Sequence, residues 1–150
     1  AMNEPVLPLW ELIQTSHIVA KGFRDLFARH GLTPTQFGVL ACLEDGDDFT
    51  KAQLARAVLV TPQSMDPLIT SLLTRGLVDR NGPAGRGRAA GIHITKAGRA
   101  LMGQVRPEVA HFNASEHIGV ADADIPQLVT NLRAIRHFLD KTSLDRDPHG

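Results

Sequence analysis

Residues 50–99, TKAQLARAVLVTPQSMDPLITSLLTRGLVDRNGPAGRGRAAGIHITKAGR, decide the fold that this sequence predicts. A short helix is predicted over residues 51–58, and a second helix begins after a turn, at Thr61-Pro62. The threonine can cap the free amides of that helix, and proline suits its first position because an amide there has no partner. Apolar residues then recur on one face of the helix, at positions 65, 68, 69, 72 and 73. The stretch therefore predicts a helix-turn-helix.

The second half of the stretch predicts two strands joined by a loop. Gly76 ends the helix, residues 77–80 start a strand, and residues 92–94 alternate as the return strand before Thr95 caps a further helix. The intervening loop is rich in glycine and arginine. This is the order of a winged helix-turn-helix, a DNA-binding device. The predicted fold is mainly α with a small β wing (α+β).

Charge is distributed unevenly along the chain, although its formal total is zero. Residues 50–99 hold eight Lys or Arg and two Asp or Glu, a net charge of +6. The remaining residues hold eight basic and fourteen acidic side chains, a net charge of −6. A basic segment within an acidic chain is typical of a phosphate-binding surface. The alternative is a solvated basic surface with no such partner.

Composition predicts one globular domain over residues 1–150, of which 43% are hydrophobic. We expect neither a membrane span nor a signal peptide, because no apolar run approaches ~20 residues. The single cysteine excludes an internal disulfide and fits a reducing compartment. With no Tyr and one Trp, the chain offers few platforms for stacking single-stranded bases, which favours duplex DNA as the partner.

Further helices are predicted on both sides of this stretch. A long helix is expected over residues 9–30, and a capping box at residues 33–36 opens a helix that reaches about residue 44. Beyond the wing, a helix over residues 96–117 is expected to be interrupted at Pro107. The acidic residues 121–124 can cap a last helix.

The outer helices indicate a dimer. We place the winged-helix region at about residues 32–99, flanked by dimerisation helices within residues 5–31 and 100–142 and followed by a disordered tail over residues 143–150. A lone winged helix has no need of the apolar faces on these helices, so another surface must cover them. A twofold dimer would also present two recognition helices to a pseudo-palindromic DNA site.

The chain resembles the multiple-antibiotic-resistance regulator (MarR) family over nearly its full length. The resemblance rests on Leu32-Thr33-Pro34-Thr35-Gln36-Phe37, Leu54-Ala55, Thr61-Pro62-Gln63-Ser64, Arg75-Gly76-Leu77-Val78-Asp79-Arg80 and Ile94-Thr95-Lys96-Ala97-Gly98-Arg99. It implies a cytoplasmic homodimer that binds double-stranded DNA, usually as a repressor. The DNA affinity of such proteins often falls when a small ligand binds between the dimerisation and DNA-binding regions.

Two positions depart from the family pattern. The wing of the family usually carries Asp-x-Arg, whereas here Arg86 stands at the Asp position and Arg88 matches the arginine. This loses a carboxylate that would brace the wing and adds a cation that can reach phosphate or a narrow minor groove. Pro67 stands near a position that is often arginine; it should lose the hydrogen bond to the Gln63 carbonyl and bend the recognition helix.

The candidate DNA contacts fall into three groups. The wing arginines are expected at the minor groove or its phosphates, and the polar face of the second helix at base edges in the major groove. A third group, formed by Lys51, Thr61 and Arg75, would contact the sugar-phosphate backbone. For each residue the alternative is an ordinary exposed side chain. The candidates are Lys51, Thr61, Gln63, Ser64, Asp66, Thr70, Ser71, Arg75, Arg86 and Arg88.

A second candidate site lies on the first helix. His17 is near Lys21 and Arg24, in a region that lines the ligand pocket of the family. A pocket lined by cations would suit a small anionic or aromatic effector, for example a phenol or a carboxylic acid. The alternative for His17 is an ordinary surface or core histidine.

The remaining residues suggest no catalytic or metal chemistry. Cys42 has no neighbouring base to lower its pKa and is expected to be buried and unreactive. The seven histidines show no i, i+4 pair, so no metal and no cofactor are expected. We find no nucleophile elbow, P-loop or dinucleotide fingerprint, so an enzyme is not expected. The alternative function keeps the fold as a dimerisation or protein-interaction module with little specific DNA binding.

Overall fold

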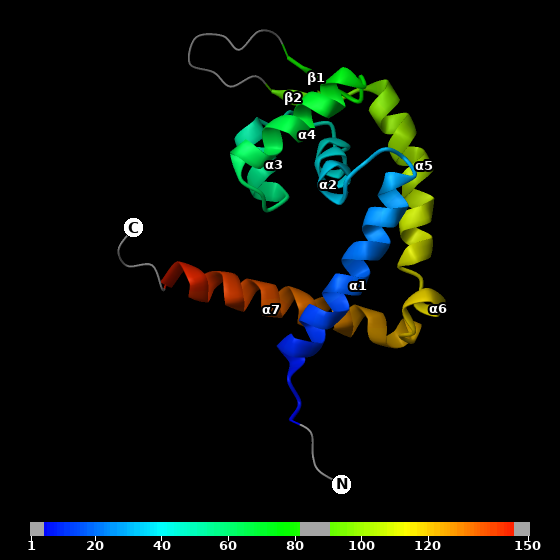
Figure 1. The fold of residues 1–150 in the computed structure, drawn as a ribbon, viewed down its shortest axis with the longest axis vertical. Helices are drawn as coiled ribbons and strands as arrows, with labels where there is room; N and C mark the ends of the chain where they lie inside the picture. Colours follow the sequence, from blue (N-terminus) through cyan, green and yellow to red (C-terminus); the bar gives the residue numbers. More distant parts are fainter. Residues whose placement is uncertain (1–4, 82–90, 146–150) are drawn as a thin grey trace. The chain divides into compact units, whose positions relative to one another are not determined.

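The computed structural model describes residues 5–81 and 91–145, with side chains described up to residue 141. Its elements, drawn in Figure 1, are α1 (Pro8–Ala28), α2 (Pro34–Leu43), α3 (Lys51–Ala57), α4 (Pro62–Thr74), β1 (Val78–Arg80), β2 (Ile92–Ile94), α5 (Lys96–Phe112), α6 (Ser115–Ile118), η1 (Asp122–Asp124) and α7 (Ile125–Asp145). The mainly α fold with a small β wing is thereby confirmed. No helix within the described ranges is long and apolar enough to cross a membrane.

The chain forms two compact units, Ala1–Glu108 and Val109–Gly150. The first contains the helix-turn-helix and the wing strands. Its core consists of side chains that are at most 2% exposed, contributed by α1, α2, α3, α4 and α5; they include Phe27, Val39, Leu40, Leu43, Leu54, Met65, Ile69, Leu72, Met102 and Val105. Of the apolar stripe predicted on α4, positions 65, 69 and 72 are buried, and positions 68 and 73 are half-buried.

Three of the helix starts follow the predicted threonine pattern. Thr33 and Gln36 form a capping box, in which the Gln36 amide donates to Thr33 Oγ1 at 3.1 Å and the Thr33 amide donates to Gln36 Oε1 at 3.0 Å. Thr50 and Gln53 repeat this arrangement before α3. Thr61 accepts a hydrogen bond from the Ser64 amide at the start of α4. Because each cap needs only residues three apart, the sequence alone is sufficient to predict it.

The two strands pair antiparallel, with Val78 opposite Ile94 and Arg80 opposite Ile92. Ile92 also forms a two-way backbone bridge to Phe49, at 2.7 and 3.1 Å, which attaches the return strand to the segment before α3. The two-stranded sheet of the wing is therefore attached through β2 to the segment that precedes α3. This third pairing was not predicted, because its partners lie 43 residues apart in sequence.

The turn between α3 and α4 contains an unusual backbone conformation. Leu59 has a φ of 59°, a left-handed value that favours glycine, and its side chain is 81% exposed. The Val60 amide donates to the Ala55 carbonyl oxygen at 3.0 Å and so closes the turn. The left-handed residue ends α3 and allows the chain to reverse into α4.

The junction between β1 and α5 is a close backbone contact. Thr95 Oγ1 donates to the Gly76 carbonyl oxygen at 2.5 Å and accepts from the Gly98 amide at 3.1 Å. The Thr95 amide donates to the Leu77 carbonyl oxygen at 3.1 Å. Gly98 lies against this same carbonyl, with no room for a side chain. Two separate parts of the sequence therefore form one contact, residues 76–77 on one side and residues 95–98 on the other.

The second unit consists of short helices followed by α7. The predicted helix break at Pro107 is wrong in position: α5 continues past this proline to Phe112, and the break falls at Asn113. The Val109 carbonyl oxygen accepts from the Asn113 side chain at 2.7 Å and from the Asn113 amide at 3.1 Å. Helix α7 reaches Asp145, so it extends into the predicted tail, and residues 146–150 lie outside the described ranges.

We predict opposite effects from the same substitution at two glycines of α5. In Gly98→Ala the new Cβ would lie 2.7 Å from Ile94 Cγ1 and closer still to the Leu77 carbonyl oxygen, so the backbone must move. We expect a loss of about 1–3 kcal/mol or more in the free energy of unfolding. Gly103→Ala, where nothing lies within 4 Å, should instead gain about 0.5–1 kcal/mol. Urea denaturation measures both; an unchanged stability in Gly98→Ala would contradict the proposed close contact.

Candidate nucleic-acid interface

The polar face of α4 is open to solvent. Gln63, Ser64, Asp66 and Thr70 are exposed, as is the cap Thr61 at the start of the helix. Because the opposite face of α4 is buried in the core, these polar side chains are held outward on a fixed scaffold. Such a surface has the dimensions and chemistry to read base edges in a major groove.

Ser71 and Pro67 qualify this picture. Ser71 is half-buried, so it contributes less to the open face than its position on the helix suggested. Helix α4 runs unbroken from Pro62 to Thr74 with Pro67 inside it, and this proline is exposed. An exposed proline offers no hydrogen bond from its side chain or its amide, so position 67 can contribute only apolar contact.

Two of the candidate DNA contacts are paired with each other. Lys51 Nζ lies 2.6 Å from Asp66 Oδ1, and both side chains are about half exposed. The pair links the first turn of α3 to α4 across the helix-turn-helix. In the unbound protein it lowers the positive charge available to phosphate at this point. Thr61 Oγ1 similarly donates to Ser64 Oγ at 2.9 Å, so the start of α4 is pre-organised by its own side chains.

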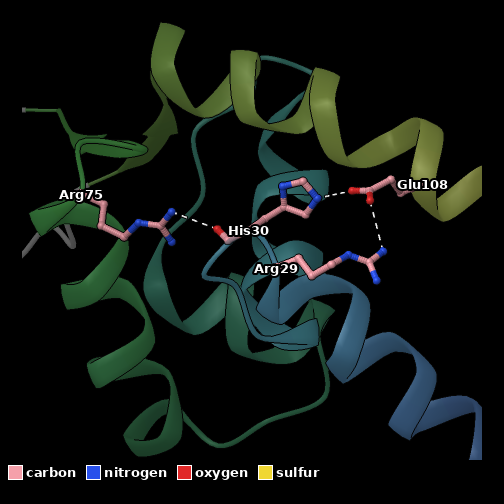
Figure 2. Close-up of polar contacts among 4 residues, drawn as sticks. All are labelled: Arg29, His30, Arg75 and Glu108. Atoms are coloured by element: carbon pink, nitrogen blue, oxygen red, sulfur yellow. Dashed lines mark hydrogen bonds and ion pairs between the residues drawn. The ribbon is translucent and has the colours of Figure 1, made fainter.

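Arg75 is exposed, and its guanidinium group is hydrogen-bonded to the protein's own backbone. Its guanidinium group donates to the carbonyl oxygen of Gly31 at 2.7 Å. It also donates to the carbonyl oxygen of His30 at 3.1 Å (Figure 2). These bonds fix the end of α4 to the turn after α1. Sequence reasoning treated Arg75 as a candidate contact to the DNA backbone, and it could not find these partners because they lie 44 and 45 residues away.

The base of the wing is braced by an aspartate that sequence reasoning missed. The Asp48 carboxylate accepts a hydrogen bond from the Asn81 side chain, and the Asn81 amide donates to the Gly91 carbonyl oxygen at 2.9 Å. Asp48 also packs against Gly91: a Cβ added to Gly91 would lie 3.1 Å from the Asp48 Cβ. Arg86 and Arg88 lie outside the described residues. The local sequence around Asp48 predicted only a turn, since its partner is 33 residues downstream.

The candidate effector residues lie on one exposed stretch of α1. His17, Lys21 and Arg24 are all exposed, and Lys21 Nζ lies 2.6 Å from Asp25 Oδ2. The hydrogen bond from Lys21 and its charge lower the pKa of the Asp25 carboxyl. Part of the positive charge expected here is therefore neutralised by an acid one helical turn away, which the sequence analysis did not consider.

Cysteine and histidine positions provide no reactive or metal-binding cluster among the described residues. Cys42 is half-buried, and burial together with the nearby charge of Asp45 raises the pKa of its thiol. A raised pKa keeps the thiol protonated, which fits the unreactive role predicted for Cys42. The rings of His111 and His117, which are six residues apart, meet at 4.0 Å between centroids because the chain turns between α5 and α6.

Comparison with known proteins agrees with this architecture. Residues 30–89 match the model of the MarR family. The HTH-type transcriptional repressor Rv2887 of Mycobacterium tuberculosis is 37% identical over 71 residues, which cover 47% of this chain and 51% of that protein. The winged-helix part of the chain is therefore similar to proteins of the MarR family. The chain spans about half the length of the curated relatives that it matches.

Solved structures of a MarR-family protein and of a transcriptional repressor share this fold over most of the chain. Rv2887 in complex with salicylic acid matches with a TM-score of 0.68 and 22% identity, over 89% of this chain and 99% of that chain. The transcriptional repressor CouR, bound to a 23-mer DNA duplex, matches with a TM-score of 0.74 and 21% identity, over 87% and 92% of the two chains. At these identities the similarity establishes the fold alone.

We predict that Asp66→Asn raises affinity for DNA of unrelated sequence by about fivefold at low salt, because it removes a negative charge from the α4 face and frees Lys51. Asp47→Asn is the matched control, since it changes the net charge equally from an exposed turn. Fluorescence anisotropy with a labelled duplex measures both variants. A selective loss of affinity for one sequence in Asp66→Asn would instead identify Asp66 as a base-reading residue.

Proposed function

We propose that this chain is a cytoplasmic, homodimeric transcriptional regulator of the MarR family that binds double-stranded DNA at a pseudo-palindromic site, as a ligand-responsive repressor. The observation that carries the proposal is the exposed polar face of α4 on a helix-turn-helix whose other face is buried. In a helix-turn-helix protein, the second helix reads the major groove from such a face.

Charge and the relatives support DNA as the partner. The net charge of +6 over residues 50–99 lies on the part of the chain that contains this helix and the wing strands. A positive surface attracts the phosphate backbone and releases its counterions. The curated relatives are named transcriptional repressors, and CouR was solved on a DNA duplex.

Exposed apolar side chains support self-association. Those of α1 and the segment before it include Val6, Leu7, Leu9, Trp10, Ile13, Ile18 and Val19. Those of α7 include Leu128, Val129, Leu132, Phe138 and Leu139. Soluble monomers seldom expose so many large apolar groups together. A second copy of the chain is the simplest cover for both faces, and it would supply the second recognition helix that a pseudo-palindrome requires.

An effector of anionic or aromatic character is proposed for the exposed stretch of α1 that carries His17, Lys21 and Arg24. Two cations and an imidazole can bind a carboxylate or a phenol. The complex of Rv2887 with salicylic acid supports this ligand class. Since Asp25 pairs with Lys21, an anionic effector would have to compete with this carboxylate.

A second candidate function is a protein-interaction module that retains the fold and binds DNA weakly. Two observations favour it: Pro67 removes a polar group from the recognition helix, and the Lys51–Asp66 pair occupies two candidate contacts internally. Such a protein would bind DNA with little dependence on sequence.

Selection from a random duplex library separates the two functions. We expect enrichment of a pseudo-palindrome, and an affinity that falls steeply with salt because several phosphates are contacted in each half-site. The loss between 50 and 200 mM salt should be about 10³-fold or more. If no motif is enriched and binding is shallow in salt, the regulator function is excluded in favour of the interaction module.

The dimer is tested by placing a charge on the apolar face of α1. Ile13→Glu should convert the dimer to a monomer in sedimentation velocity, since Ile13 is 48% exposed within the proposed interface. Ala52→Glu adds the same charge at an exposed position of α3, outside both apolar faces, and should remain dimeric. A wild-type protein that sediments as a monomer, or equal behaviour of the two variants, would contradict this interface.

A further inference from the structure

Arg75 closes the end of α1 as well as the end of α4. The last carbonyls of a helix and of the turn after it have no partner within the helix. Arg75 donates to two of them in succession, those of His30 and Gly31, with the two prongs of one guanidinium group. A planar fork suits two neighbouring carbonyl oxygens, and its positive charge faces the negative end of the α1 dipole.

The turn is shaped to receive this guanidinium group. Gly31 has a φ of 67°, which a residue with a side chain adopts at a cost. A Cβ built on Gly31 would lie 3.3 Å from Arg75 Nη1 and 3.4 Å from Nη2. The glycine therefore serves two needs at once, the left-handed turn and the close approach of Arg75.

The same turn is held from its other side by α5. The His30 ring is hydrogen-bonded through Nε2 to the Glu108 carboxylate, and Arg29 Nη2 lies 3.1 Å from Glu108 Oε1 (Figure 2). These contacts, the His30 bond first, lower the pKa of Glu108 and keep it ionised. His30 therefore connects the two sides of the turn. Its backbone carbonyl accepts a hydrogen bond from Arg75 at the end of α4, and its ring is hydrogen-bonded to Glu108 on α5.

The result is a continuous polar path from α4 to α5, which we call the turn network: Arg29, His30, Gly31, Arg75 and Glu108. Arg75 follows the last turn of α4, about 20 Å from the Thr61 cap at the usual rise per residue. Recognition helices of this type contact bases with their N-terminal part. The network therefore acts on the end of the helix that is remote from the groove.

We propose that Arg75 is a positioning residue for DNA reading, and that the turn network, through Glu108 and His30, sets the orientation of α4 relative to α5. The inference rests on the proposed DNA-binding function. It replaces the direct phosphate contact that the sequence suggested for Arg75. It also makes Glu108, an acid on a helix that supplies none of the candidate DNA contacts, a residue whose removal weakens binding.

The test uses the full chain and the duplex selected by the wild-type protein, with a scrambled duplex for comparison. Arg75→Lys keeps the charge but has one ammonium group in place of the two-pronged fork, and Glu108→Gln removes the charge that holds His30. We expect each to lower affinity for the selected duplex about 5- to 30-fold, with a smaller loss on the scrambled duplex and an unchanged salt slope. The double variant should lose less than the product of the two single losses, because both act on one network.

A direct phosphate contact gives a different pattern. Arg75→Lys would then stay near wild type, Arg75→Gln would lose about one unit of salt slope on both duplexes, and Glu108→Gln would bind as well as wild type or better. This pattern overturns the inference while leaving the DNA-binding function intact. Arg56→Gln, an exposed arginine of α3 outside the network, calibrates the effect of losing one positive charge. Wild-type protein that selects no duplex would instead overturn the proposed function.

A second readout is independent of DNA. Amide hydrogen exchange at residues 29–32 should accelerate in Arg75→Lys and in Glu108→Gln, because both remove bonds that hold this turn. Urea denaturation verifies that each variant is folded. Unchanged exchange in both variants would show that the turn does not depend on the network and would contradict the inference.

Discussion

The winged-helix unit depends on one close backbone contact, where the first turn of α5 meets the carbonyl of Leu77 at Gly98. Thr95 fixes this contact with a hydroxyl that donates to Gly76 and accepts from Gly98. Since Gly76 follows the recognition helix and Ile94 ends the return strand, the contact sets α4, the wing and α5 against one another. A single methyl group at position 98 would push these three elements apart. The geometry of the candidate DNA-binding surface therefore depends on a contact that need not touch DNA.

Around this contact, polar side chains of α5 attach it to the helical body. Arg99 donates to the Glu44 carbonyl oxygen at 2.7 Å, and Arg106 pairs with the Glu44 carboxylate. Glu108 then holds the turn after α1, which Arg75 meets from the other side. Some charged groups in this part of the molecule thus form intramolecular hydrogen bonds and ion pairs, and others are candidate DNA contacts. The net charge of +6 over residues 50–99 therefore overstates the positive charge available to phosphate, because some of these cations are paired within the protein.

Helix boundaries, caps and the order of elements could be predicted from the sequence because their causes are local. A capping box needs residues three apart, a buried stripe needs helical spacing, and Gly76 stops a helix by its own left-handed φ of 71°. The break after α5 was misplaced because Pro107 was weighed by its missing amide alone. A helix tolerates the loss of one hydrogen bond when its neighbouring turns persist, and α5 continues past Pro107 to Phe112.

The sequence by itself determined the winged helix-turn-helix, the exposed polar face of α4 and the resemblance to the MarR family, since periodicity, caps and motif order are local properties of the chain. Only the tertiary structure decided what the polar residues meet. Asp48 braces the wing, Lys51 pairs with Asp66, and Arg75 binds carbonyls 44 and 45 residues away. The physical reason is that a charged side chain has no preferred partner until folding brings one within about 3 Å, and that proximity is set by the packing of the whole unit.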